Sequence, residues 1–160
     1  MKKDQRDLLL EFNARNVRFL IVGGYAYSHY TEPRAPKDLD VLIATTDENV
    51  QLVYEALANF GAPLAGVTAQ DFQQPKSWFQ IGVPPSRVDV VQSIDAIDFD
   101  SAWENSLEGI IDDDIPVRFI SLDDLIRNKL AVGRLRDLAD VEDLRAAVAA
   151  NSKPTEPEGE

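Results

Sequence analysis

The chain has 160 residues, 44% of them hydrophobic and 28% charged, a composition typical of one globular domain with its own hydrophobic core. It contains no cysteine and a single histidine, which excludes disulfide bonds, thiolate metal sites and multi-histidine zinc sites within the chain. Its formal net charge of −12 argues against general binding of long nucleic acids, because such binding requires Lys and Arg to neutralise phosphates.

The first residues lack the apolar core of a signal peptide, and every apolar stretch is too short to span a bilayer. We therefore expect no membrane contact and a cytoplasmic location. Residues 1–150 are expected to form a single domain, and 151–160 a disordered acidic tail rich in Pro and Glu.

Predicted strands alternate with predicted helices along the chain. Apolar or β-branched runs bounded by turn residues indicate strands over 19–22, 39–44, 78–83, 87–92 and 115–120. Amphipathic stretches with capping residues indicate helices over 4–14, 24–30, 47–60, 121–132 and 137–148. Residues 62–75 are expected to be irregular, and 93–114 follow no clear pattern. This order predicts an α/β (or α+β) fold with a mixed sheet and flanking helices.

Capping signals predict the ends of several helices. Asp4 is expected to cap the first helix. Ser121 opens the clearest one with capping-box spacing, and Gly133 ends it. The last helix is expected to begin at Asp137.

The first chemical signal is the sequence Asp38-Leu39-Asp40-Val41. Because side chains alternate along a strand, Asp38 and Asp40 share one face while Leu39 and Val41 point into the core. Two carboxylates held this close repel each other unless a cation lies between them, and Mg²⁺ prefers such oxygen ligands. The alternative is a strand whose solvent face is simply acidic.

The second signal is Asp89, a single carboxylate inside the β-branched run Arg87-Val-Asp-Val-Val. An ion pair with Arg87, or an exposed strand face, would explain it without function. If the strand of Asp89 lies beside that of Asp40, however, three carboxylates come together. Such a cluster suits a pair of metal ions in phosphoryl chemistry.

Two further features could bind the phosphates of a nucleotide. Gly23-Gly24 between a strand and a helix lets a phosphate approach backbone N–H groups at the helix N-terminus, although such a turn is often only a turn. Lys129 falls at the centre of the apolar stripe of its helix. Its charge either extends past the core to water or points into a cleft.

Taken together, these residues resemble the DNA-polymerase-β-like nucleotidyltransferase superfamily. The hydrophobic strand ending in Gly23-Gly24, the Asp38-x-Asp40 strand and the later Asp89 match its signature. The segment 122–144 is similar to the C-terminal helices of small bacterial members, among them the AbiEii-like toxins of toxin–antitoxin systems. The resemblance implies a nucleotidyltransferase-like mixed sheet with a C-terminal helical pair.

The resemblance also implies an activity, Mg²⁺-dependent transfer of a nucleoside monophosphate from a nucleoside triphosphate to a hydroxyl acceptor. Asp38, Asp40 and Asp89 would hold the metal, and Asp89 would also act as base. The nucleotide would be bound by a second set of residues: Gly23, Gly24, Arg34, Lys37 and Lys129. The acceptor stays open between a tRNA, a protein and a small molecule, and a partner antitoxin is a further expectation.

Two alternatives belong to other classes of protein. The chain could be a non-catalytic interaction protein with the nucleotidyltransferase fold, such as a toxin–antitoxin partner. It could also be a phosphohydrolase that uses the same carboxylates, although the sequence has no additional His/Asp metal cluster.

Overall fold

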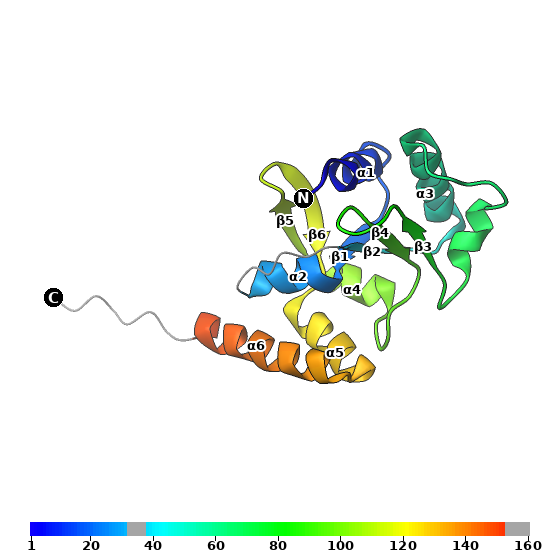
Figure 1. Ribbon diagram of the computed structural model, residues 1–160. Coiled ribbons are helices and arrows are strands. Elements are labelled where there is room, and N and C mark those ends of the chain that lie inside the picture. Colours follow the sequence, from blue (N-terminus) through cyan, green and yellow to red (C-terminus); the bar gives the residue numbers. More distant parts are fainter. Residues whose placement is uncertain (32–37, 153–160) are drawn as a thin grey trace.

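The computed structural model describes residues 1–31 and 38–152. Its centre is a six-stranded mixed sheet with the order β3-β4-β2-β1-β6-β5 (Figure 1). The strands are β1 (Phe19–Val22), β2 (Leu39–Ile43), β3 (Trp78–Ile81), β4 (Val88–Val91), β5 (Leu107–Ile111) and β6 (Ile115–Phe119). This sheet and its helices confirm the predicted fold class.

The register of the central strands places the site. β1 runs antiparallel to β2, with Val22 opposite Asp40, and β2 runs parallel to β4, with Asp40 opposite Asp89. β1 is also parallel to β6, so the sheet is mixed on both sides of its centre. The buried β1 residues account for the wholly apolar 19–22 run, since a central strand is covered on both faces.

Helices cover both sides of the sheet. The helical segments are α1 (Lys3–Ala14), α2 (Gly23–Tyr30), α3 (Asp47–Phe60), the short 3₁₀ helix η1 (Ala69–Gln73), α4 (Phe99–Asn105), α5 (Leu122–Val132) and α6 (Leu135–Ser152). In Figure 1, α1 and α3 lie together above the sheet, while α2 lies below it with the α5–α6 hairpin beneath. α5 and α6 are the predicted C-terminal helical pair. Within the described residues, no helix is both long enough and apolar enough to cross a membrane.

Several predicted boundaries were wrong by a few residues. α1 begins at Lys3, so its N-cap residue is Lys2 rather than Asp4, and the Lys2 backbone N–H donates to the side chain of Gln5. α6 begins at Leu135 because Asp137 accepts the Arg134 backbone N–H from inside the helix, instead of preceding it. Residues 62–75, expected to be irregular, include η1, and the uninterpreted 93–114 segment contains α4 and β5.

Candidate active site

Two aspartates from different strands lie side by side in the sheet. Asp40 on β2 is the register partner of Asp89 on β4, so the parallel pairing brings their carboxylates to the same level. Asp38 lies just before β2, two residues from Asp40 and on the same face. Leu39 and Val41 are fully buried on the other face, as the alternation predicted. The condition set for a three-carboxylate cluster, that the Asp89 strand lies beside the Asp40 strand, is therefore met.

Gly23 faces Asp40 across the β1–β2 pair. It adopts a positive φ of +64°, and a β-carbon at this position would collide with the Asp40 carboxylate. Only glycine fits both conditions without strain. The close approach puts Asp40 at the first residue of α2, where Val22 supplies no side-chain cap. The first backbone N–H groups of α2, including that of Gly24, are therefore not capped by the side chain of the N-cap residue. These N–H groups lie next to the carboxylate cluster.

Arg87 is a site residue that the sequence interpretation treated only as a neighbour of Asp89. Its Nη2 donates to Asp38 Oδ2 at 2.6 Å, and its Nε lies 3.6 Å from Asp89 Oδ1. The guanidinium therefore bridges carboxylates that come from β4 and from the segment before β2. The arginine and Asp38 side chains are 29% and 28% exposed, so this ion pair is half-buried.

The Asp40 carboxyl has a strongly raised pKa. Its pKa is raised from 3.8 to about 7, chiefly by burial, then by the negative charge of Asp89 and a hydrogen bond with it, and by Asp38. The positive charge of Arg87 acts in the opposite direction. Near neutral pH, Asp40 therefore holds a proton part of the time. A cation bound here would favour the ionised form of Asp40.

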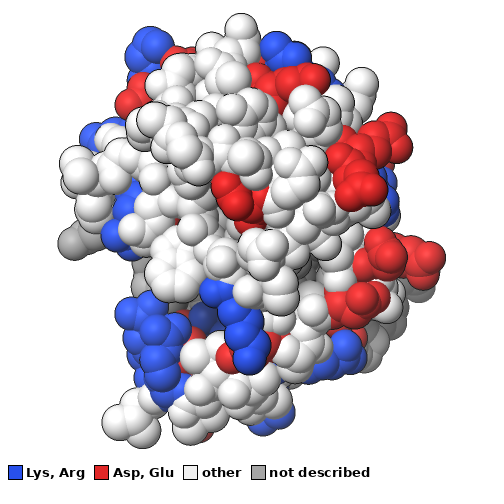
Figure 2. Space-filling view, turned by 90° about the vertical axis from the view of Figure 1, so that its right-hand side faces the viewer, with Lys and Arg blue, Asp and Glu red and all other residues white. Residues whose placement is uncertain are grey.

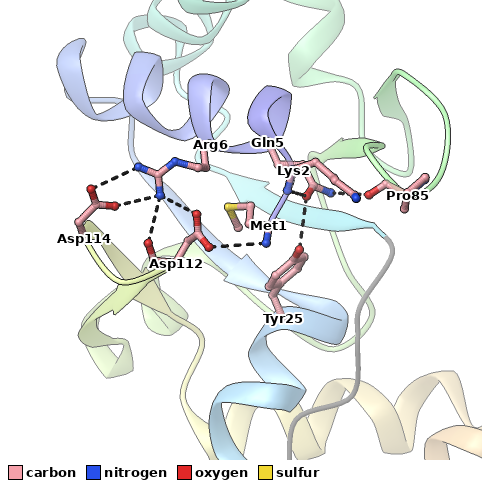
Figure 3. A network of polar contacts seen from close by, with 8 residues as sticks. All are labelled: Met1, Lys2, Gln5, Arg6, Tyr25, Pro85, Asp112 and Asp114. Carbon is pink, nitrogen blue, oxygen red and sulfur yellow. Dashed lines mark hydrogen bonds and ion pairs between the residues drawn. The ribbon is translucent and has the colours of Figure 1, made fainter.

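A buried glutamine holds the backbone next to this cluster (Figure 3). Gln5 on α1 is fully buried, and its Nε2 donates to the carbonyl of Pro85 at 3.4 Å and to that of Arg87 at 3.1 Å. Its Oε1 accepts from the hydroxyl of Tyr25 on α2 at 3.3 Å. One side chain thus connects α1, the start of α2 and the turn that leads into β4. No sequence pattern indicated this role, because a polar residue in the first helical turn is common.

Lys129 adopts neither of the two arrangements considered from the sequence. Its Nζ donates to Asp140 Oδ2 at 2.8 Å, lies 3.8 Å from Asp137 Oδ1, and the side chain is 12% exposed. It therefore forms an ion pair inside the α5–α6 hairpin. The ammonium also lies 5.6 Å from the ring centre of Tyr27 on α2. A contact between Lys129 and a nucleotide stays a prediction.

Basic side chains gather in the lower part of the face in Figure 2, where the α5–α6 hairpin lies. Arg127 and Arg134 are 61% and 59% exposed, and each pairs with a buried aspartate beneath it. Two further basic residues predicted to bind nucleotide, Arg34 and Lys37, lie outside the described residues, and their role stays a prediction.

A family model described as "Nucleotidyltransferase of unknown function (DUF6036)" matches residues 2–150. The chain belongs to this family. This membership confirms the nucleotidyltransferase superfamily predicted from Gly23-Gly24 and Asp38-x-Asp40. Among curated proteins, no sequence matches the chain.

Solved structures of other proteins share the nucleotidyltransferase fold. The crystal structure of ANT(2")-Ia in complex with adenylyl-2"-tobramycin is 15% identical, with a TM-score of 0.63 over 92% of this chain and 88% of that one. The lincomycin-bound lincosamide antibiotic adenylyltransferase LnuA is also 15% identical, with a TM-score of 0.58 over 92% and 98%. An antigenic nucleotidyltransferase-like protein from Paracoccidioides brasiliensis is 14% identical, with a TM-score of 0.53 over 97% and 78%. At these identities the likeness establishes the fold.

The carboxylates of this nucleotidyltransferase have the chemistry that a divalent metal needs. Asp38 Oδ1 and Asp89 Oδ1 are buried and accept no hydrogen bond from the described residues. Buried carboxylate oxygens without a hydrogen bond are costly, and hard cations such as Mg²⁺ satisfy them. Across the described part of the chain, however, no three acidic or histidine side chains already form a metal-binding group. The donors fit a metal, but Asp38 is engaged by Arg87.

Proposed function

We propose that this protein transfers a nucleoside monophosphate from a nucleoside triphosphate to a hydroxyl acceptor, in a Mg²⁺-dependent reaction. One observation carries the proposal: Asp40 and Asp89 lie in register beside the N-terminus of α2, with Gly23 against Asp40 and no side-chain cap from Val22. Carboxylates for a cation and backbone N–H groups for a phosphate thus meet at one point. Family membership supports the same chemistry at a coarser level.

Each residue has a role in this proposal. Asp38, Asp40 and Asp89 would hold the metal, which when bound would neutralise the triphosphate and withdraw charge from the α-phosphate. The N–H groups at Gly23 and Gly24 would bind the phosphates. Asp89 would take the proton from the hydroxyl group of the acceptor molecule. The oxygen of that hydroxyl would bond to the α-phosphorus as the bond from the α-phosphorus to the bridging oxygen breaks and pyrophosphate leaves. Lys129, Arg34 and Lys37 are proposed to balance the remaining charge.

A small molecule is the acceptor class that we propose first. The ANT(2")-Ia structure contains adenylyl-2"-tobramycin, and the lincosamide antibiotic adenylyltransferase LnuA is lincomycin-bound, so both of these proteins bind a small molecule. The net charge of −12 favours a cationic small molecule over a tRNA, which would need basic residues. Cytoplasmic location and a toxin–antitoxin role stay predictions, and binding of a neighbouring-gene product to the purified chain would test the latter.

Calorimetry with a triphosphate analogue, carrying a methylene group between its α- and β-phosphates, tests the nucleotide site. The analogue is tested with each of the four bases. We expect the wild type to bind at least one of these four analogues, and only when Mg²⁺ is present. The double variant Asp38→Asn/Asp40→Asn should lose that binding. The double variant Asp100→Asn/Asp123→Asn removes the same charge from exposed positions and should bind like the wild type.

A wild type that binds none of the four analogues would contradict the proposal. The non-catalytic interaction protein would then be the better interpretation. Positive binding would justify a screen for acceptors with labelled nucleotide, starting with cationic small molecules that carry hydroxyl groups.

A further inference from the structure

Arg87 lies against two of the carboxylates that are proposed to hold a cation. Its guanidinium contacts Asp38 Oδ2 at 2.6 Å and lies within 3.6 Å of Asp89 Oδ1. One positive charge is thus shared between two of the three carboxylates. The other oxygen of Asp38, Oδ1, remains buried without a hydrogen bond from the described residues. Arg87 therefore neutralises the cluster in part and leaves donor capacity unused.

The backbone of Arg87 is held by hydrogen bonds, whereas its side chain is partly exposed. Its carbonyl accepts from Leu39 N at 3.0 Å and from Gln5 Nε2 at 3.1 Å, which ties the start of β4 to β2 and α1. The side chain, by contrast, is 29% exposed, and its buried Nε donates no hydrogen bond within the described residues. A rotation of this side chain changes the charge of the site without moving Asp89.

A guanidinium and a divalent metal ion compete for these carboxylates. Both carry positive charge, and at contact distance in a half-buried site their repulsion is large. Asp38 directs one oxygen to Arg87, and no three side chains in the described ranges are yet arranged around a common point as metal ligands. The positive charge of Arg87 beside Asp38 and Asp89 therefore opposes metal binding until its side chain moves away.

We propose that Arg87 is a displaceable counter-ion of the carboxylate cluster, which metal must replace and which then pairs with the triphosphate. Free Mg²⁺ has to compete with Arg87 and binds weakly. Metal that arrives with a triphosphate brings the negative charge that receives the displaced guanidinium. The site thereby discriminates the metal–nucleotide complex from the free ion. This inference rests on the proposed function, since it concerns the same metal and nucleotide.

The test measures metal binding without nucleotide, using Mn²⁺ as the probe and calorimetry as the readout. We expect Arg87→Met to bind Mn²⁺ about tenfold more tightly than the wild type, a change equivalent to about 1.4 kcal/mol. Arg145→Met removes the same charge from an exposed position on α6 and should leave the affinity unchanged. An unchanged or lower affinity in Arg87→Met, or an equal gain in Arg145→Met, would overturn the proposal.

A second variant covers the case in which Arg87→Met does not fold. Arg87→Lys keeps the charge but loses the planar fork, and it should give a smaller gain in Mn²⁺ affinity. The Mn²⁺ titration is repeated with the methylene triphosphate analogue present. The analogue should raise Mn²⁺ affinity strongly in the wild type and less in either variant, because each variant has lost the arginine contact to the triphosphate.

The outcomes separate this inference from the proposed function. If the wild type and the variants bind neither Mn²⁺ nor the metal–analogue complex, both proposals fail. If the wild type binds the metal–analogue complex but Arg87→Met and Arg87→Lys show wild-type affinity for Mn²⁺ alone, only the role of Arg87 fails.

Discussion

Gly23 and Asp40 are so close that a β-carbon on the glycine would overlap the carboxylate of the aspartate. Gly23, the first residue of α2, therefore lines the acidic site. Its contact with Asp40 joins the two features on which the proposed chemistry depends, the carboxylate pair and the helix N-terminus.

Gly23→Ala is expected to abolish binding of the Mg²⁺–triphosphate analogue complex. The new methyl group would displace Asp40, and the left-handed backbone would add a cost of about 1–2 kcal/mol. Calorimetry and thermal melts measure the two effects. Gly66→Ala is the matched control, because Gly66 has a φ of +77° but open space around it. If Gly23→Ala binds the complex as Gly66→Ala does, the contact with Asp40 has no functional role.

Asp40→Asn is expected to stabilise the metal-free protein, and more at pH 8 than at pH 4. The folded pKa of Asp40 is about 7, above its ordinary value of 3.8, so the fold favours the neutral carboxyl. The stability that this provides is complete below 3.8 and is lost as pH rises through 7. Asparagine stays neutral throughout, so its advantage at pH 8 is up to a few kcal/mol, because each tenfold change in an acid dissociation constant corresponds to about 1.4 kcal/mol.

Thermal melts with a chelator at pH 4, 6 and 8 measure this pH dependence. The exposed Asp123→Asn change should have little effect at any pH. If the difference in stability between the wild type and Asp40→Asn is the same at pH 8 as at pH 4, folding does not raise the pKa of Asp40.

Gln5→Leu is expected to lower the free energy of unfolding by roughly 1–3 kcal/mol, the usual cost of buried polar groups left without partners. The carbonyl of Pro85 and the hydroxyl of Tyr25 would lose their bonds to this side chain. Urea denaturation measures the change. Tyr25→Phe removes one of these bonds and should cost less, about 0.5–1.5 kcal/mol. Equal stability of Gln5→Leu and the wild type would contradict the proposed support role.

Lys129→Met is expected to destabilise the α5–α6 hairpin by roughly 3 kcal/mol, because it leaves buried carboxylates without their lysine. Asp137 and Asp140 are both buried and lie within ion-pair distance of Lys129. Adding Asp140→Asn should recover part of the loss, so a double-mutant cycle in urea measures the coupling. Additive effects of the two changes would show that the pair contributes no coupling energy.

Local sequence information was sufficient for much of the fold. α5 begins after Ser121 and ends at Gly133, as predicted. Such helix ends can be read from the sequence because a capping hydrogen bond or a left-handed C-terminal glycine involves only residues a few positions apart. The alternation that puts Asp38 and Asp40 on one face is equally local. β5 was not predicted, because three of its five residues are exposed and only its pairing with β6 makes it a strand.

The sequence by itself determined the candidate residues: the glycine pair, the Asp38-x-Asp40 spacing and the isolated Asp89. The tertiary structure alone decided their relations. Asp89 meets Asp40 only because β4 joins the sheet beside β2 in a particular register, Arg87 bridges to Asp38 across that junction, and Gln5 reaches the Arg87 carbonyl from α1. Capping and alternation are set by neighbours in the chain, whereas contacts between distant segments depend on how the whole core packs, which no local pattern encodes.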